Sequence, residues 1–585
     1  TGVVDGRWIR NYSGAVNVKL FGAVGDGVTD DTASIQNAAL TGLKLLFKNG
    51  TFLVDSGFVK ITQGVEFDNS AIVFTGVGDG SVNDGWVYFD NPTKSILPEW
   101  FGAVGDGVTN DATAIQMALD CLIDTRIDAL GVTANPNHGI YNSGTIEFSG
   151  GKDYYRGDTT IEIRSEHHFI GVRLINSSPS KYTSNIKGND ATTVCFKVTT
   201  PDNISGDGAS TNKEFINLGI INASRGIEFG RSDQSNKVIG CRFQVMSEAC
   251  VYGTPDGVDN LQIKDNTIND SGGGYVAKLK NASLCIIDGN LSGESAQNTK
   301  GVYVVGGTSR SGNIISNNTF RGGEIYVTTN SAFTDHGNIV SNNAIIQGVA
   351  TTGDAVINID STSRTTVVEG NVVDTTETIK CIRFFDGLVS GNRTSGGTHG
   401  IFSAGLGNIQ GNKIVSATSF GIEVNRGTSQ CECVISNNNI EDCATGVRIQ
   451  ADSTGGTMVT SNTIDGCAVG LTGGSGYQRG FTTDNRFFNC TTNETTYKPT
   501  PNRQHDRTLF IDTFSSSDAE SIKVRSGTNR NAVVVGTYSS IPIAGTWKAG
   551  DIVFNTSPIA GGKVGWVCTA SGTSGTWKAF GIIDA

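Results

Sequence analysis

Short segments of alternating apolar and polar residues recur between residues 236 and 490. Each copy has an apolar residue, a turn, a polar residue that is nearly always Asn, and another apolar residue. The copies read VIGCRF, IKDNTI, IIDGNL, ISNNTF, VSNNAI, VEGNVV, VSGNRT, IQGNKI, ISNNNI, VTSNTI and TTDNRF. The polar position is held by Cys241 and then by Asn266, Asn290, Asn318, Asn343, Asn371, Asn392, Asn412, Asn438, Asn462 and Asn485. The mean period of about 24 residues predicts one structural repeat per copy.

A second alternating segment follows each Asn by about ten residues. Its copies read GIEF, CVYG, GVYV, EIYV, CIRF, GIFS, GIEV and GVRI. Alternation with period two predicts β-strands, but strands this short need neighbours to form a sheet. One period with three such strands therefore predicts one coil of a parallel β-helix, with coils about 4.8 Å apart.

The recurring Asn is predicted to be structural. Asn tolerates the left-handed backbone region, and its side chain can bond to the Asn of the next coil. Cysteines at 443, 467 and 490 follow the same spacing and should stack as a buried column. Cys431 and Cys433 are interpreted as two buried thiols rather than as a disulfide or a metal site.

A segment of 20 residues occurs twice near the N-terminus. FGAVGDGVTDDTASIQNAAL begins at Phe21 and FGAVGDGVTNDATAIQMALD at Phe101, with 13 identical positions. Asp30 and Asp31, like Asn110 and Asp111, are predicted to cap a short amphipathic helix that covers the end of a coil. The glycine-rich start is not followed by the Lys-Ser/Thr of a phosphate-binding loop, so a phosphate site is not expected.

The composition supports a turn-rich repeat protein. The chain has 585 residues, of which 77 are Gly, and only 17% of its residues are charged. The net charge of −12 argues against nucleic acid as a partner. No apolar stretch is long enough for a membrane span, so no membrane partner is expected.

The residues after Pro499 differ from the repeats. Trp547, Trp566 and Trp577 lie here, and GTWKA occurs at 545–549 and again at 575–579. This end is predicted to be a small β domain that serves as a trimer clasp or a sugar-binding module. Each Trp suits a domain core or interface as well as a sugar-stacking surface.

The start motif followed by an Ile-Gln helix, a Gly-Thr-Ile strand at 144–146 and Asn-containing coils resembles a known family. It is similar to the pectate-lyase-like right-handed parallel β-helices of bacteriophage tailspikes and of capsule or O-antigen depolymerases. The resemblance covers residues 20 to 495 and implies an all-β fold with short N-terminal capping helices and a small C-terminal β domain. It implies three parts: residues 1–97 as a head with a short β unit, 98–498 as the main β-helix, and 499–585 as a C-terminal β domain.

The resemblance also implies a setting. Such a protein is a homotrimer of the virion tail, attached to the phage tail or baseplate through its N-terminal region. It binds and cuts bacterial surface polysaccharide, outside the host cell.

The second strand of each coil predicts an outward-facing column. If its apolar residues point inward, a mixed set of aromatic and charged residues points outward, namely Tyr252, Tyr303, Tyr326, Arg383, Phe402, Glu423 and Arg448. Of these, Tyr303, Tyr326, Arg383, Phe402 and Arg448 are the predicted substrate-binding residues. The column fits a polysaccharide groove, and a buried trimer interface would need much the same composition.

Glycoside hydrolysis needs two carboxyl groups on either side of the scissile bond. The carboxylates near this strand are Glu228, Glu324, Asp354, Asp360, Asp386 and Glu423. Asp360 and Asp386 lie on adjacent coils and are the predicted acid and base. Glu423 is a third catalytic candidate, or half of an ion pair with Arg448, while Asp386 before Gly387 could be a turn residue. His399 is expected to border the groove.

Three functions follow as alternatives. The first is an endo-acting glycoside hydrolase that depolymerises capsule or O-antigen. The second is a polysaccharide lyase, which would need a uronate, a Lys or Arg base and often Ca²⁺. The third is an adhesin that binds without cutting. The outward column shows no Asp cluster that would hold a cation, so neither metal nor cofactor is predicted.

Overall fold

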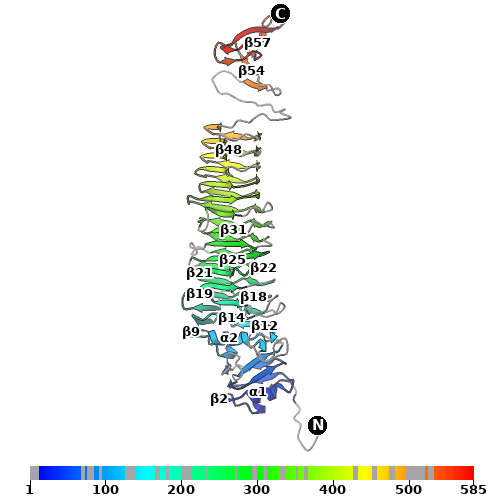
Figure 1. The fold of residues 1–585 in the computed structure, drawn as a ribbon, viewed down its shortest axis with the longest axis vertical. Coiled ribbons are helices and arrows are strands. Elements are labelled where there is room, and N and C mark those ends of the chain that lie inside the picture. Colours follow the sequence, from blue (N-terminus) through cyan, green and yellow to red (C-terminus); the bar gives the residue numbers. More distant parts are fainter. Residues whose placement is uncertain are drawn as a thin grey trace, which may run out of the picture. The chain divides into compact units, whose positions relative to one another are not determined.

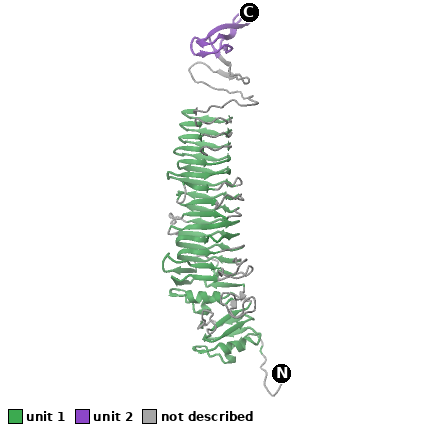
Figure 2. Ribbon diagram, in the orientation of Figure 1, with its two compact units in different colours: residues 1–499 green, residues 500–585 purple. Residues whose placement is uncertain are grey.

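The computed structural model describes most of the chain. The described residues are 12, 14–67, 73–75, 85–90, 95–124, 140–141, 143–164, 172–178, 184–199, 212–230, 235–270, 273–292, 300–307, 312–329, 337–350, 354–360, 366–425, 433–450, 457–473, 481–495, 521–524 and 533–584. The chain has two compact units, residues 1–499 and 500–585 (Figure 2). The predicted division into three parts stays a prediction.

The larger unit is a parallel β-solenoid, as the repeats predicted (Figure 1). Its first face is a 14-stranded parallel sheet in which each strand pairs with the copy one coil later. The strands are β12 (Gly144–Phe148), β15 (Val172–Asn176), β18 (Lys213–Ile216), β20 (Lys237–Ile239), β23 (Gln262–Lys264), β26 (Ile286–Asp288), β29 (Ile314–Ser316), β32 (Ile339–Ser341), β35 (Val367–Glu369), β38 (Gly387–Ser390), β41 (Gly407–Gln410), β44 (Cys433–Ser436), β47 (Met458–Thr460) and β50 (Phe481–Thr483).

Each coil has a second strand, which from residue 242 onward directly follows the ladder position. These strands are β9 (Asp106–Asn110), β13 (Asp153–Gly157), β16 (Asn185–Gly188), β19 (Gly219–Phe229), β21 (Arg242–Gly253), β24 (Thr267–Asp270), β27 (Leu291–Ser292), β30 (Thr319–Arg321), β33 (Ala344–Ile346), β36 (Val372–Thr375), β39 (Arg393–Gly396), β42 (Lys413–Val415), β45 (Asn439–Glu441), β48 (Thr463–Asp465) and β51 (Arg486–Phe488).

The third strand of each coil carries the predicted outward column. The strands are β14 (Ile161–Arg164), β17 (Phe196–Thr199), the later parts of β19 and β21, β25 (Tyr275–Ser283) with the short β22 (Val258–Asp259) beside it, β28 (Gly301–Gly306), β31 (Glu324–Thr329), β34 (Ala355–Asp360), β37 (Lys380–Phe384), β40 (His399–Ser403), β43 (Phe420–Asn425), β46 (Thr445–Gln450), β49 (Val469–Gly473) and β52 (Thr492–Thr495).

The predicted Asn ladder is present. From Asn266 to Asn462, each side-chain amide donates to the Oδ1 of the next ladder residue at 2.9 Å. The left-handed residue is not the ladder Asn itself, as the sequence had suggested, but the residue before it, for example Asn317 (φ 54°) before Asn318. The ladder Asn instead turns its side chain inward, where the Asn of the next coil meets it.

Residues before β12 form a first, shorter set of coils. Its parallel sheets are β1 (Val16–Asn17), β3 (Leu45–Phe47) and β6 (Val65–Phe67); β2 (Asp26–Asp30), β4 (Thr51–Leu53) and β7 (Val73–Thr75); and β5 (Phe58–Ile61) with β8 (Trp86–Phe89). The other elements are the 3-10 turns η1 (Val18–Phe21) and η2 (Pro98–Phe101), the helices α1 (Thr32–Ala39) and α2 (Ala112–Asp120), and the antiparallel pair β10 (Ile123–Asp124) and β11 (Ile140–Tyr141). One apolar core runs from Val16 to Leu471.

Both predicted helices form, and two of the four predicted caps are present. Asp30 accepts the N–H of Thr32 and Asn110 that of Ala112, each at 3.0 Å, whereas Asp31 and Asp111 act differently from the prediction. Asp31 precedes α1, yet its carboxylate accepts the N–H groups of Val24 (2.7 Å) and Gly25 (3.0 Å) and does not cap the helix. Asp111 does the same for the second copy. Asp26 accepts the N–H groups of Val28 and Thr29. The chain's own carboxylates therefore occupy the loop amides that a phosphate would need.

The cysteines are free thiols throughout the described residues. Cys443 and Cys467 are buried and Cys490 is half-buried, in agreement with the predicted column, and Cys433 is buried. Cys431 lies outside the described residues. None of the described helices is long and apolar enough to cross a membrane.

The smaller unit has a five-stranded sheet and a two-stranded one. The first contains β53 (Ser521–Val524), β54 (Val533–Tyr538), β56 (Ile552–Asn555), β57 (Lys563–Ala570) and β59 (Thr576–Ile582), and the second β55 (Thr546–Trp547) and β58 (Gly572–Thr573). Trp547 and Trp577 are buried with Val553 and Cys568 and have ring centroids 4.9 Å apart. These two Trp residues are therefore core residues of this unit.

Candidate functional site

The third strands align the predicted residues in one column. Register pairing joins Tyr252, Lys278, Tyr303, Tyr326, Asn358, Arg383, Phe402, Glu423, Arg448 and Thr472, one per coil. We call these ten residues the outward column. Their apolar strand neighbours, such as Ile382 and Ile422, are fully buried. The placement predicted for all five substrate-binding candidates and for Glu423 is thus observed, while their roles stay proposals.

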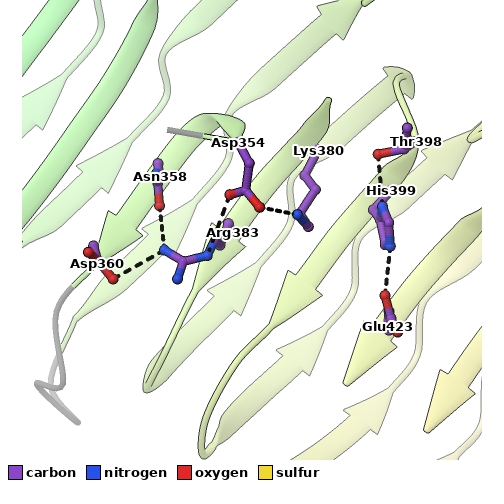
Figure 3. Close-up of polar contacts among 8 residues, drawn as sticks. All are labelled: Asp354, Asn358, Asp360, Lys380, Arg383, Thr398, His399 and Glu423. Carbon is purple, nitrogen blue, oxygen red and sulfur yellow. Dashed lines mark hydrogen bonds and ion pairs between the residues drawn. The ribbon is translucent and has the colours of Figure 1, made fainter. Parts of the chain in front are cut away.

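Arg383 is the centre of a polar cluster (Figure 3). Its Nη1 donates to Oδ1 of Asn358 at 2.9 Å and lies 3.2 Å from Oδ1 of Asp360. Its Nε lies 3.6 Å from Oδ1 of Asp354, and Asp354 also pairs with Lys380. The Arg383 side chain is 18% exposed, whereas those of Asp354 and Asp360 are 58% and 40% exposed. The cations are therefore held beneath two accessible carboxylates.

The shared guanidinium limits the separation of Asp354 and Asp360. Because both carboxylates contact one rigid planar group, their facing oxygens lie within about 9 Å of each other. Inverting glycosidases separate their two carboxyl groups by about 6.5 to 9.5 Å, and retaining ones by about 5 to 5.5 Å. This upper limit is compatible with either geometry.

The structure does not bring the predicted pair Asp360 and Asp386 to a common partner. Asp386 is only 7% exposed, and its Oδ1 accepts the backbone N–H of Leu406 in the next coil. A side chain at Gly405 would collide with the Asp386 carboxylate. Asp386 therefore matches the turn role that the sequence left as its alternative, and Asp354 is the carboxylate beside Asp360.

Glu423 is held by two partners. Its Oε2 lies 2.6 Å from Nε2 of His399, whose Nδ1 hydrogen-bonds to Thr398 Oγ1 at 2.8 Å (Figure 3). Its Oε1 lies 3.5 Å from Nη1 of Arg448, so the predicted ion pair is present. Glu423 is 4% exposed, which leaves its carboxylate little access to a ligand.

Aromatic rings cover these charged groups. Lys380 Nζ lies 4.8 Å from the centroid of Phe402, and the Arg448 guanidinium lies 4.7 Å from that of Phe420. The centroid of the His399 ring lies 5.7 Å from that of Phe402 and 5.2 Å from that of Phe420. Lys380, Phe420 and Asn358 are not among the residues predicted from sequence. Lys380, His399 and Phe420 pair in register, each three residues before its neighbour in the outward column.

Tyrosines extend the column toward the N-terminal coils. The rings of Tyr303 and Tyr326 are stacked, with centroids 5.1 Å apart and an interplanar angle of 10°. Burial raises the pKa of Tyr326, and the nearby charge of Asp360 adds to the effect. Stacked half-buried rings beside carboxylates form a surface suited to sugar rings.

Two other carboxylates considered in the sequence, Glu228 and Glu324, are buried and so have little access to a ligand. Glu228 is 6% exposed, and its Oε2 lies 2.6 Å from Nη1 of Arg225. Glu324 is fully buried. Within the described part of the chain, no three His, Cys, Asp or Glu side chains gather in a way that could hold a metal ion.

The chain is similar to one phage appendage protein and, in fold, to β-helix proteins. No family model matches it. The pre-neck appendage protein of Bacillus phage B103 is 32% identical over 163 residues, which cover 25% of this chain and 18% of that protein. The match therefore spans about a fifth of that relative's length.

Solved structures with related folds are 10 to 18% identical. Tailspike protein 3 of bacteriophage CBA120 is 13% identical over 84% of this chain and 70% of that chain, with a TM-score of 0.40. The tailspike of E. coli bacteriophage HK620, solved with a pentasaccharide, is 10% identical over 83% and 92%, with a TM-score of 0.41. The A-module of the Azotobacter vinelandii mannuronan C-5 epimerase AlgE4 is 18% identical over 70% and 100%, with a TM-score of 0.35. The structural neighbours of this chain are thus phage tailspikes and other β-helix proteins.

Proposed function

We propose that this chain is a phage tail protein that binds a bacterial surface polysaccharide along the outward column and hydrolyses it between Asp354 and Asp360. The observation that carries the proposal is the pair of accessible carboxylates on one guanidinium, in line with stacked tyrosines. The start motif and the similarity to a phage appendage protein support the virion setting.

The charges around the two carboxylates suggest their roles. Asp354 contacts two cations, Lys380 and Arg383, whereas Asp360 contacts Arg383 alone. We assign the base to Asp354, whose carboxylate is held in place by both cations, and the acid to Asp360. In this scheme Asp360 protonates the leaving glycosidic oxygen while Asp354 takes a proton from the attacking water.

The test is incubation of the purified protein with host surface polysaccharides, with new reducing ends as the readout. Asp354→Asn and Asp360→Asn should each lower turnover by at least about 100-fold with binding retained, because positioned proton transfer contributes about 10² to 10⁴. Asp386→Asn is the matched control, since its amide oxygen can still accept the Leu406 N–H. Near wild-type turnover in both Asp354 and Asp360 variants would refute this site. Loss of turnover in Asp360→Asn and Asp386→Asn, with Asp354→Asn near wild type, would restore the pair predicted from sequence.

β-Elimination is a second candidate, favoured by the cations Lys380 and Arg383 beside His399. Such groups could neutralise a uronate and remove its acidic proton. Products that absorb ultraviolet light as unsaturated uronates would identify this reaction. A polymer that is bound but left intact would identify an adhesin.

A further inference from the structure

A second cluster of charged and aromatic residues lies on the N-terminal part of the same face. Tyr252 in β21, Tyr275, Lys278 and Lys280 in β25, and Lys300 before β28 form what we call the upstream cluster. Lys278 and Lys280 have Nζ 5.8 Å and 5.6 Å from the Tyr252 ring. Lys278 and Lys300 each lie 5.6 Å from the Tyr275 ring. Three ammonium groups therefore surround two tyrosine rings.

The cluster has more cations than its neighbouring acids can neutralise. Arg225, stacked 3.7 Å over Tyr252, pairs with Glu228 and Glu248 at 2.6 Å each. Lys278 pairs with Glu248 at 3.0 Å, so these two cations are balanced by two carboxylates. Lys280 and Lys300 form no ion pair with any residue that the structure describes. Lys280 and Lys300 thus add two ammonium groups that no described carboxylate neutralises, in a chain whose net charge is −12.

These lysines are not typical solvated surface side chains. Lys278 is 23% exposed, and Lys280 and Lys300 are half-buried beside tyrosines that are almost fully buried. A contact with an aromatic ring stabilises a lysine ammonium group by only about as much as a weak ion pair does. Such a contact uses no N–H donor of the ammonium group, so these donors can still bind an anion. An anionic group is the ligand that this arrangement can complete.

The upstream cluster is continuous with the proposed site. Tyr252 and Lys278 belong to the outward column, and the Tyr275 ring lies 5.7 Å from that of Tyr303, which stacks on Tyr326. Five coil steps separate Tyr252 from Arg383, a span of about 24 Å at about 4.8 Å per coil. A single extended polysaccharide can therefore contact both places.

We propose that the upstream cluster is a subsite for an anionic sugar, so that the polysaccharide bound by this protein carries carboxylate or phosphate groups. Sugar rings of the polymer pack on Tyr303 and Tyr326 while its anionic groups pair with Lys280 and with Lys300. This inference rests on the proposed function, because it names the class of polymer that the outward column binds.

The test measures binding of the full chain to an array of purified bacterial surface polysaccharides that includes uronate-bearing, phosphate-bearing and neutral polymers. The best-bound polymer should be acidic, and Lys280→Gln with Lys300→Gln should weaken its binding by about tenfold or more, as expected for loss of charge-assisted contacts. Raising NaCl from about 50 mM to about 500 mM should weaken wild-type binding much more than binding by the double variant. Lys264→Gln, a half-buried lysine on the 14-stranded sheet, is the matched control.

Chemical reduction of the carboxyl groups of the bound polymer separates the two anion sources. Lost binding identifies a uronate, whereas retained binding to a phosphate-bearing polymer identifies phosphate. Tight binding of a neutral polymer, unaffected in the double variant, would overturn this inference and leave the proposed function standing. Absence of binding to every polymer would overturn both, provided that the melting curves show folded protein.

Discussion

Replacing one asparagine in the middle of the ladder tests what holds the solenoid together. Asn371 is fully buried, and its Nδ2 donates to the backbone oxygen of Val340 and to Asn392 Oδ1, both at 2.9 Å. Its Oδ1 accepts the backbone N–H and the side-chain amide of Asn343, again at 2.9 Å. Asn371→Ala therefore removes four hydrogen bonds and leaves their buried partners, in the coil before and the coil after, unsatisfied.

The magnitude follows from those orphaned groups. A buried polar group without a partner costs about 1 to 3 kcal/mol, and local relaxation recovers part of this. We expect Asn371→Ala to lower the free energy of unfolding by about 3 to 5 kcal/mol. The measurement is the urea midpoint and the unfolding rate followed by far-ultraviolet circular dichroism.

Asn439→Ala is the matched control. Asn439 follows the ladder residue Asn438 directly, is half-buried and donates only to Glu441 Oε1, at 2.8 Å. We expect this variant to lose less than about 1 kcal/mol. Asn371→Asp adds a second check, because it keeps the acceptor but places a charge in the ladder, and it should unfold more readily at neutral than at acid pH. Equal midpoints for Asn371→Ala and Asn439→Ala would refute the idea that the ladder stabilises the coils.

Three other predictions concern protonation, thiols with metals, and assembly. Burial lowers the pKa of Lys213 to about 7 from 10.5, so the unfolded chain binds more protons between these values and stability should rise with pH there. Lys213→Met should abolish that rise in the urea midpoint, and an unchanged pH profile would contradict the burial argument. Burial raises the pKa of Cys285 and of Cys381 to about 12, so a thiol reagent at pH 8 should label neither until the protein unfolds, and EDTA should leave turnover unchanged. Light scattering should give three times the mass of one chain, and the mass of a single chain would exclude the expected homotrimer.

The repeated coils explain why so much of the fold could be predicted. A period of about 24 residues with alternating strands has few packing solutions, and the interior asparagines fix one coil on the next. The position of the left-handed residue could not be predicted from the sequence. The turns contain two adjacent polar residues, such as Asn317 and Asn318, and only the structure shows which of them adopts positive φ and which points its side chain inward. Asp31 and Asp111 were wrongly predicted to cap the helices for a related reason. Their carboxylates accept N–H groups that lie six to seven residues earlier in the chain.

The candidate site could be predicted only where it follows the strand period. Alternation placed Arg383, Phe402 and Glu423 on one face, because strand pairing repeats that face in every coil. Asp354 and Asp386 lie outside the strands, at turns whose lengths differ between coils. At such turns, spacing in the sequence does not predict which way a side chain points. Asp354 turned toward Arg383, and Asp386 turned toward the backbone of Leu406.

Stability and chemistry occupy opposite sides of the same strands. Ile382 and Ile422 point into the core, and the ladder bonds connect the coils from within, whereas Arg383 and Glu423 contact only outward side chains. Because a strand's alternate residues face opposite ways, an outward residue can change without disturbing the ladder. The same arrangement lets one scaffold present different charges and rings along its length, with uncompensated lysines near Tyr252 and paired carboxylates near Arg383. Under the proposed function, a long polymer contacts both places, so that one set of coils would select its charge while another would hold the bond to be cut.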